Sequence, residues 1–362
     1  MKKIIALIFL ISTINLAQSW NSIKTSNISV SLTDNVEMFT NSFGNNIIKE
    51  SSGVLTYYAM NVSGTAGAGI TIESSGVTNA NITGDEHRVY VVYEKDNVIK
   101  AKYSTNSGSN WTTISNLSVN PTSLDAVYYN GLLHLTYSAS NLASYYQFTG
   151  SSSAKYKDVS STEAGTNPRI EILEDENKVY VAYDNGDNCK SREYNVVTNS
   201  WGSIQTLFTS LSDANLAGFG VDANYIYLYY YRWEVDPIFG GGFSLFENKI
   251  QKSNYSTVSS LRYFRTEVFF TNSTTTYDEK VITALQWIDA LGKYEAPDAG
   301  LNIATFDDGT RSFQTVYATY DPLNHVDISS THNDLHVIWK IPSSSYLRYR
   351  QYDTTPSTPQ KT

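Results

Sequence analysis

The stretch that decides the fold is Val89-Tyr90-Val91-Val92-Tyr93, in which β-branched and aromatic residues follow a polar turn. Alternation at period two among such residues is typical of β-strands. Seven copies of the pattern begin at Val54, Val89, Leu133, Val179, Ile226, Val281 and Leu335. Successive copies are 35 to 55 residues apart. A repeat of roughly 40–50 residues built from short strands predicts an all-β propeller, with one four-stranded sheet per blade.

The two ends of the repeat region predict how the ring closes. The last repeat, around 325–352, lacks an outermost strand, whereas Trp20-Asn21-Ser22-Ile23-Lys24 resembles the segments at Trp111 and Trp201 that finish other blades. We therefore expect the N-terminal strand to complete the last blade, which removes free sheet edges. The prediction is a single propeller over residues 20–355 with seven blades, and six or eight remain open.

The first nineteen residues have the pattern of a secretory signal peptide. Lys2 and Lys3 precede an apolar run from Ile4 to Leu16, and Ala17-Gln18-Ser19 supplies small residues for cleavage. We expect cleavage near Ser19 and a secreted or periplasmic protein without a membrane span. Residues 356–362 are expected to be a disordered tail.

Composition narrows the partners. The chain of 362 residues is 41% hydrophobic, 17% charged and 13% aromatic, which excludes a disordered protein. Its net charge of −9 disfavours nucleic acid as a partner. Cys189 is the only cysteine, so no intrachain disulfide can form.

One turn resembles a known family. The segment Ser104-Thr105-Asn106-Ser107-Gly108-Ser109-Asn110-Trp111 is similar to the Asp-box of sialidase-like (BNR) propellers, with Asn106 in the acidic position. The resemblance implies a folding role for Ser104, Asn106, Gly108 and Trp111, and it implies no enzymatic activity. Sialidases bind a carboxylated sugar through three arginines, one of them in an Arg-Ile-Pro motif, and this chain has no Arg-Ile-Pro.

Two long segments, at 231–242 and 287–298, follow the recurring strand in adjacent repeats and are expected to project on one face. Aromatic rings beside carboxylates are a usual surface for sugars. The predicted ligand-binding residues, including one histidine at a blade-to-blade loop, are Arg232, Trp233, Trp287, Tyr294 and His325. If the protein is an enzyme, the candidate catalytic carboxylates are Glu234, Asp236, Asp289, Glu295 and Asp298.

Three functions remain open at this stage. The sequence favours a secreted binding module for glycans. The alternatives are a glycan-cleaving hydrolase or lyase and a protein-interaction scaffold in the cell envelope. No cofactor or metal site is predicted, although Asp184-Asn185-Gly186-Asp187-Asn188 offers oxygen ligands for Ca²⁺ without EF-hand spacing.

Overall fold

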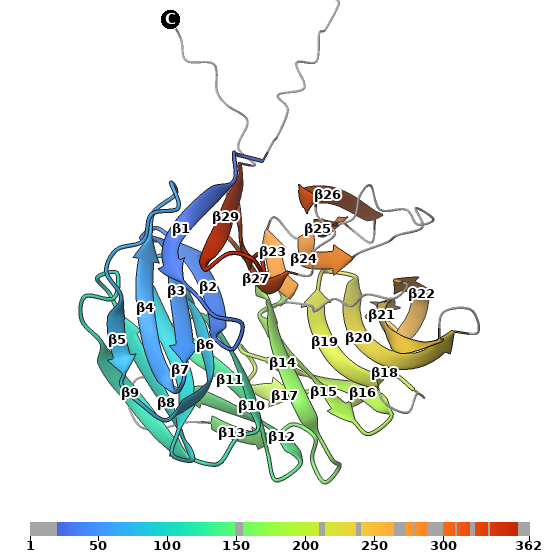
Figure 1. Cartoon of the computed structure of the whole chain (residues 1–362). Helices are drawn as coiled ribbons and strands as arrows, with labels where there is room; N and C mark the ends of the chain where they lie inside the picture. Colours follow the sequence, from blue (N-terminus) through green and yellow to red (C-terminus); the bar gives the residue numbers. More distant parts are fainter. Residues whose placement is uncertain are drawn as a thin grey trace, which may run out of the picture.

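The computed structural model describes residues 20–148, 155–209, 214–236, 240–263, 273–277, 280–287, 300–307, 310–318, 323–331 and 334–353. These residues form seven antiparallel sheets in a ring, which is a seven-bladed β-propeller (Figure 1). Each blade has four strands, and the fourth strand of blade 4 is split in two. The predicted fold class and blade number are therefore confirmed. None of the helical segments in the described ranges is long and apolar enough to cross a membrane.

The blades follow one another along the chain. Blade 1 contains β2 (Asn35–Asn41), β3 (Gly44–Ser51), β4 (Val54–Met60) and β5 (Ile70–Glu73). Blade 2 contains β6 (Val77–Asp85), β7 (Arg88–Lys95), β8 (Val98–Ser104) and β9 (Thr112–Ser118). Blade 3 contains β10 (Ser123–Tyr129), β11 (Leu132–Ala139), β12 (Leu142–Phe148) and β13 (Lys155–Asp158). Blade 4 contains β14 (Thr166–Leu173), the 3₁₀ turn η1 (Glu174–Glu176), β15 (Lys178–Asn185), β16 (Asn188–Asn195), β17 (Ser200–Trp201) and β18 (Gln205–Phe208).

The remaining three blades complete the ring. Blade 5 contains β19 (Ala214–Val221), β20 (Tyr225–Asp236), β21 (Gly240–Gln251) and β22 (Ser256–Tyr263). Blade 6 contains β23 (Ser273–Tyr277), β24 (Lys280–Trp287), β25 (Gly300–Asp307) and β26 (Thr310–Ala318). Blade 7 contains β27 (Asn324–Ser330), β28 (Asp334–Lys340), β29 (Tyr346–Asp353) and, from the other end of the chain, β1 (Lys24–Ser29).

The first strand of each blade is innermost. Contacts run between the first strands of neighbouring blades in the closed cycle β2, β6, β10, β14, β19, β23, β27 and back to β2. These seven strands therefore surround the axis of the propeller.

The N-terminal strand closes the ring as expected. β1 pairs antiparallel with β29, with Lys24 opposite Tyr349, and the two strands lie side by side in Figure 1. The strand begins at Lys24, later than the predicted Trp20, which instead forms an isolated bridge with Tyr352. Ring closure thus joins the two ends of the described chain.

The recurring pattern marks the second strand in blades 2 to 7, where the side chains of β7, β11, β15 and β28 are buried almost without interruption. Strands covered on both faces favour such continuous apolar runs. The first copy, at Val54, is an exception because it lies in β4, the third strand of blade 1. The second strand of blade 1 is β3, which carries the buried amides Asn45 and Asn46 in place of apolar residues and therefore lacks the recurring apolar pattern.

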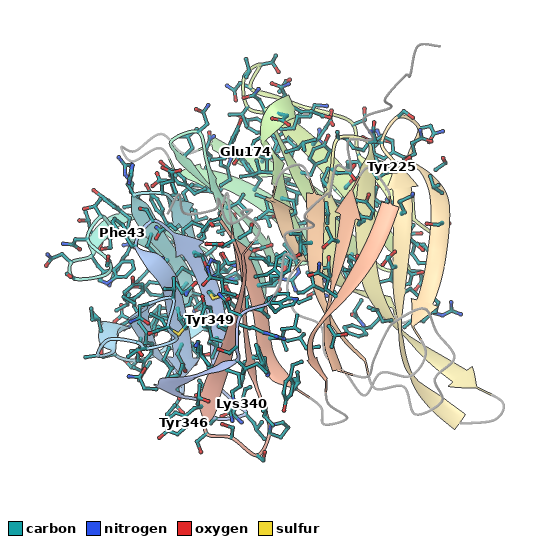
Figure 2. The ribbon with its side chains drawn as sticks, turned by 90° about the horizontal axis from the view of Figure 1, so that it is seen from above. Phe43, Glu174, Tyr225, Lys340, Tyr346 and Tyr349 are labelled. Atoms are coloured by element: carbon teal, nitrogen blue, oxygen red, sulfur yellow. The ribbon has the colours of Figure 1, made fainter. Side chains whose placement is uncertain are left out.

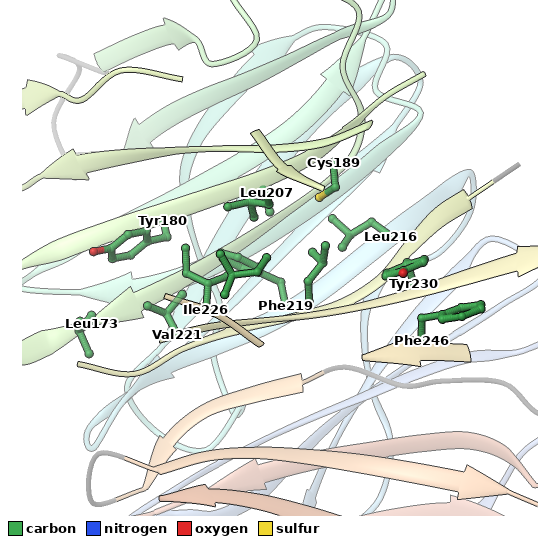
Figure 3. Packing of buried hydrophobic residues seen from close by; sticks show 13 residues of the cluster. Leu173, Tyr180, Cys189, Leu207, Leu216, Phe219, Val221, Ile226, Tyr230 and Phe246 are labelled. Carbon is green, nitrogen blue, oxygen red and sulfur yellow. The ribbon is translucent and has the colours of Figure 1, made fainter. Parts of the chain in front are cut away.

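The core consists of layers between neighbouring blades. Figure 3 shows one of them, a cluster that includes Leu173 and Tyr180 of blade 4 and Phe219 and Tyr230 of blade 5. Cys189 is a free cysteine buried in this layer, and burial raises the pKa of its thiol well above the ordinary value. A thiol in this environment is inert at neutral pH.

The turn that resembles an Asp-box connects β8 to β9. Ser104 Oγ donates to Asn106 Oδ1 at 2.9 Å and accepts from the Gly108 N–H at 2.9 Å, and Asn106 Oδ1 accepts from the Asn110 N–H at 2.9 Å. Trp111 meets Tyr57 of blade 1 edge-on, with ring centroids 5.3 Å apart. The turn therefore fastens blade 2 to blade 1.

A position can need glycine because of its backbone angle or because there is no space for a Cβ atom. Gly108 in this turn and Gly131 in another turn have nearly the same backbone angle and therefore separate the two reasons. Gly108 has φ +79° and a Cβ there would lie 2.1 Å from the Tyr57 ring, whereas Gly131 has φ +80° and nothing within 4 Å of a Cβ. We expect Gly131→Ala to lower the free energy of unfolding by about 1 kcal/mol through backbone strain alone. Gly108→Ala should cost about 3 kcal/mol, because the Tyr57 ring must also move. Equal losses in denaturant titrations of the two variants would contradict the packing role of Gly108.

Candidate functional site

A cavity of about 190 Å³ lies on the axis of the propeller. It is lined by side chains from the innermost strands β2, β6, β10, β14, β19 and β27. Its charged lining residues are Glu37, Asp125, Arg169, Glu171 and Asp327. We call this cavity the channel site.

A chain of hydrogen bonds surrounds the channel site and joins consecutive blades. In each case a side chain of one blade accepts from a backbone N–H on the innermost strand of the next. The pairs are Asp327 with Met38 at 2.6 Å, Glu37 with Ile82, Thr83 with Tyr128 at 3.1 Å, Asp125 with Ile170 at 3.1 Å and Asp184 with Leu216 at 3.1 Å. We call this set of bonds the inter-blade collar. It spans five consecutive junctions, from blade 7 through blade 1 to blade 5.

The collar carboxyl groups are in an unfavourable environment for negative charge. Burial raises the pKa of Glu37 well above its ordinary value, and the nearby Asp327 and Asp125 raise it further. Burial also raises the pKa of Asp125, and the positive charge of Arg169 opposes this shift. For Asp184, burial raises the pKa to about 6. Loss of hydration is thus the main cause in all three.

Two lining residues have unused hydrogen-bonding capacity. Among the described residues, Arg169 Nε has no hydrogen-bond partner, and no carboxylate there forms an ion pair with its guanidinium. Asn81 is 8% exposed and donates its Nδ2 to Asp125 Oδ1 at 3.1 Å, but its Oδ1 accepts no hydrogen bond from the described part of the chain. Unpartnered buried polar groups are uncommon in folded proteins.

Sequence analysis missed this site, although a signal was present. Glu37, Asn81, Asp125 and Arg169 are spaced by 44 residues in each step and hold the same place in the first strands of blades 1 to 4. Because these strands are polar at the axis, a search for apolar alternation overlooks them.

The second predicted site is on one face of the propeller. Figure 2 shows Glu174, in the connection between β14 and β15, and Tyr225, the first residue of β20, on the opposite side from Lys340 and Tyr346. In blade 5, β20 and β21 have twelve residues each, against seven or eight in the other second strands. Beyond Arg232, the last residue of β20 that pairs with β19, the described parts of β20 and β21 continue as a two-stranded ribbon, 232–236 paired with 240–244, on the Lys340 side (Figure 2).

The predicted residues of blade 5 lie on this ribbon, in strand rather than in the expected loop. Trp233, Glu234 and Asp236 pair across the ribbon with Phe243, Gly242 and Gly240. The guanidinium carbon of Arg232 lies 5.7 Å from the centroid of the Phe246 ring. The structure thus places Arg232 where the ribbon leaves the sheet.

Trp287 is the last residue of β24, the second strand of blade 6, and therefore ends on the same face as the ribbon. Asp289, Tyr294, Glu295 and Asp298 lie outside the described residues.

His325 is at the start of the innermost strand of blade 7. Its Nε2 lies 2.7 Å from the Ser31 carbonyl oxygen, in the connection between β1 and β2. Burial lowers the pKa of the imidazole, so it is neutral at pH 7 and donates to this carbonyl. The ring therefore joins blade 7 to the closing segment.

The hairpin considered for Ca²⁺ uses its first carboxylate elsewhere, since both Asp184 oxygens lie 3.1–3.2 Å from the Leu216 nitrogen. In the described ranges, no group of three or more His, Cys, Asp or Glu side chains is arranged to hold a metal ion.

Comparison with known proteins gives the fold and nothing finer. No family model matches the chain, and no curated protein matches its sequence. Among solved structures, the Pan2 WD40 domain of Neurospora crassa is 7% identical over 91% of this chain and 89% of its own, with a TM-score of 0.53. An oligogalacturonate lyase in complex with manganese is 9% identical over 93% and 96%, with a TM-score of 0.55. A fungal alcohol oxidase in complex with copper is 11% identical over 95% and 79%, with a TM-score of 0.57.

These likenesses show a β-propeller, a fold consistent with a binding or scaffold module. At such low identity they carry no activity or ligand across to this chain. The resemblance of the Ser104–Trp111 turn to sialidase-like propellers stays a prediction.

The pKa of Asp184 predicts a pH-dependent stability. Its folded-state pKa of about 6 is above the ordinary 3.8, so the folded protein binds the proton more tightly than the unfolded chain. This contribution is present below pH 4 and is lost as the pH rises toward 6, a change of about 3 kcal/mol. We expect the stability of the wild type relative to Asp184→Asn to fall by most of that amount between pH 4 and 7 in urea titrations. A difference that does not vary with pH would contradict the assignment, and the exposed Asp187→Asn in the same hairpin is the control.

Proposed function

We propose that the protein is a secreted binding module that holds a glycan on the face where the blade 5 ribbon stands. The observation that carries this proposal is the ribbon itself. It extends β20 and β21 by four to five residues beyond the length of the equivalent strands. An extension of this kind, on one blade only among the second strands described, is typical of a functional insertion on a rigid scaffold.

The chemistry of the segment supports a sugar. Arg232 and Trp233 are at the base of the ribbon, Glu234 and Asp236 are farther along it, and Trp287 ends the equivalent strand of the next blade. Aromatic rings cover the apolar face of a pyranose, while carboxylates accept its hydroxyl protons. Two adjacent blades can therefore contribute to one surface. The signal-peptide pattern of residues 1–19 supports secretion.

The test is binding of the protein beginning at Trp20 to a glycan array, with Trp233→Ala and Trp287→Ala as variants. Loss of a stacking ring should weaken binding of the recognised glycan at least tenfold. Tyr346→Ala is the matched control, because Tyr346 is an exposed aromatic at 45% exposure on blade 7. Its binding should equal that of the wild type.

Other outcomes would overturn the proposal. Binding to no glycan, together with co-purification of an envelope protein, would indicate a scaffold. Turnover of a bound glycan that is lost in Glu234→Gln would indicate an enzyme.

A further inference from the structure

The channel site contains opposite charges, and Arg169 forms no ion pair with the described carboxyl groups of the same cavity. Three acidic side chains, Glu37, Asp125 and Asp327, line the same cavity as Arg169. We propose that the channel site binds one small zwitterion, a molecule with both a carboxylate and a protonated amine. This proposal is independent of the glycan surface on the ribbon.

The guanidinium of Arg169 argues for the carboxylate. A guanidinium has five N–H donors in a planar fork that matches a carboxylate. Among the described residues, Arg169 has no ion pair and its Nε has no acceptor, although carboxyl groups line the same cavity. A ligand carboxylate supplies two acceptors in the geometry that the fork requires.

The acidic side chains argue for the amine. Asp125 accepts from the N–H groups of Ile170 and Ala126 and from Asn81, and Asp327 accepts from those of Met38 and Ile328. The donors to Asp125 are neutral, and the one positive charge that acts on it from the described residues is that of Arg169, which forms no ion pair with it. An ammonium group supplies positive charge to Glu37, Asp125 and Asp327, and a donor to the free Oδ1 of Asn81.

A ligand with a single charge satisfies only one side of the channel site. A simple anion would pair with Arg169 but would be held beside Asp125 and Asp327, which repel it. A simple cation, including a metal ion, would be repelled by Arg169 and would leave its donors unused. A zwitterion satisfies both groups at once.

The cavity volume sets the size of the ligand. The volume of the channel site is about 190 Å³. It is smaller than the ~300–1,000 Å³ of sites for drug-sized ligands. A free amino acid with a short side chain is therefore the appropriate probe.

Binding should also release a proton. Glu37 faces Asp125 from β10, Arg169 from β14 and Asp327 from β27, and its pKa is raised by burial and by the two aspartates. Glu171 and Asn81 line the same cavity. An ammonium group beside Glu37 favours the ionised carboxylate, so the pKa falls, a proton leaves and affinity increases as the pH rises.

The experiment is isothermal titration calorimetry of the protein beginning at Trp20 with three matched probes. Alanine carries both charges, propionate lacks the amine and ethylamine lacks the carboxylate. We expect saturable binding of alanine at least tenfold tighter than that of either other probe. The heat should change with the ionisation enthalpy of the buffer, which reports the released proton.

Two variants locate the site. Arg169→Met should weaken alanine binding at least tenfold. Glu37→Gln keeps the shape and removes the titrating group, so binding should weaken and proton release should disappear. Arg88→Met and Glu86→Gln change an exposed arginine and an exposed glutamate in one hairpin and should leave binding unchanged.

Several results would overturn the proposal. Equal binding of propionate would indicate an anion site, and equal binding of ethylamine, calcium or manganese would indicate a cation site. Binding of glucose with no binding of alanine would assign a neutral ligand. Absence of binding of every probe to the folded wild type, checked by circular dichroism, would remove the site altogether. If Arg169→Met does not fold, unchanged binding and proton release in Glu37→Gln would be sufficient to reject the proposal.

Discussion

Backbone N–H groups that are buried where the innermost strand of one blade faces the next need hydrogen-bond acceptors at that junction. Buried backbone N–H groups without acceptors cost about 1–3 kcal/mol each. In this protein, side chains of the preceding blade supply the acceptors at five consecutive junctions, from Asp327 at Met38 to Asp184 at Leu216. Four of these acceptors are carboxyl groups, which form stronger bonds than neutral acceptors when they are ionised.

This solution brings negative charge to the axis. Burial raises the pKa values of Glu37, Asp125 and Asp184, so part of the favourable hydrogen bonding is offset by lost hydration. Arg169 supplies the positive charge on the same ring of residues, yet it pairs with none of the described carboxylates. The residues that join the blades therefore also create a polar cavity at their centre.

Much of the architecture could be predicted from sequence. The second strand of each blade is covered on both faces, and such a strand requires consecutive apolar and aromatic residues. The pairing of the N-terminal strand with the last blade was also predictable, because the last repeat lacks an outermost strand of its own. The pattern failed in blade 1, where buried Asn46 accepts from the Tyr57 hydroxyl at 2.6 Å and occupies the place of an apolar side chain. The channel site was missed because its lining residues come from six blades and its charged and amide side chains do not follow the apolar pattern. Their constant spacing of 44 residues was the available signal.

The most direct test of the collar is hydrogen exchange at single amides in the native protein. In the wild type, the N–H groups of Ile82 and Ile170 should both be strongly protected, because Glu37 and Asp125 accept from them. Asp125→Ala removes only the second acceptor. The account predicts a selective loss of protection at Ile170 with Ile82 unchanged. Full protection of Ile170 in that variant would show that the inter-blade carboxylates do not hold the ring together.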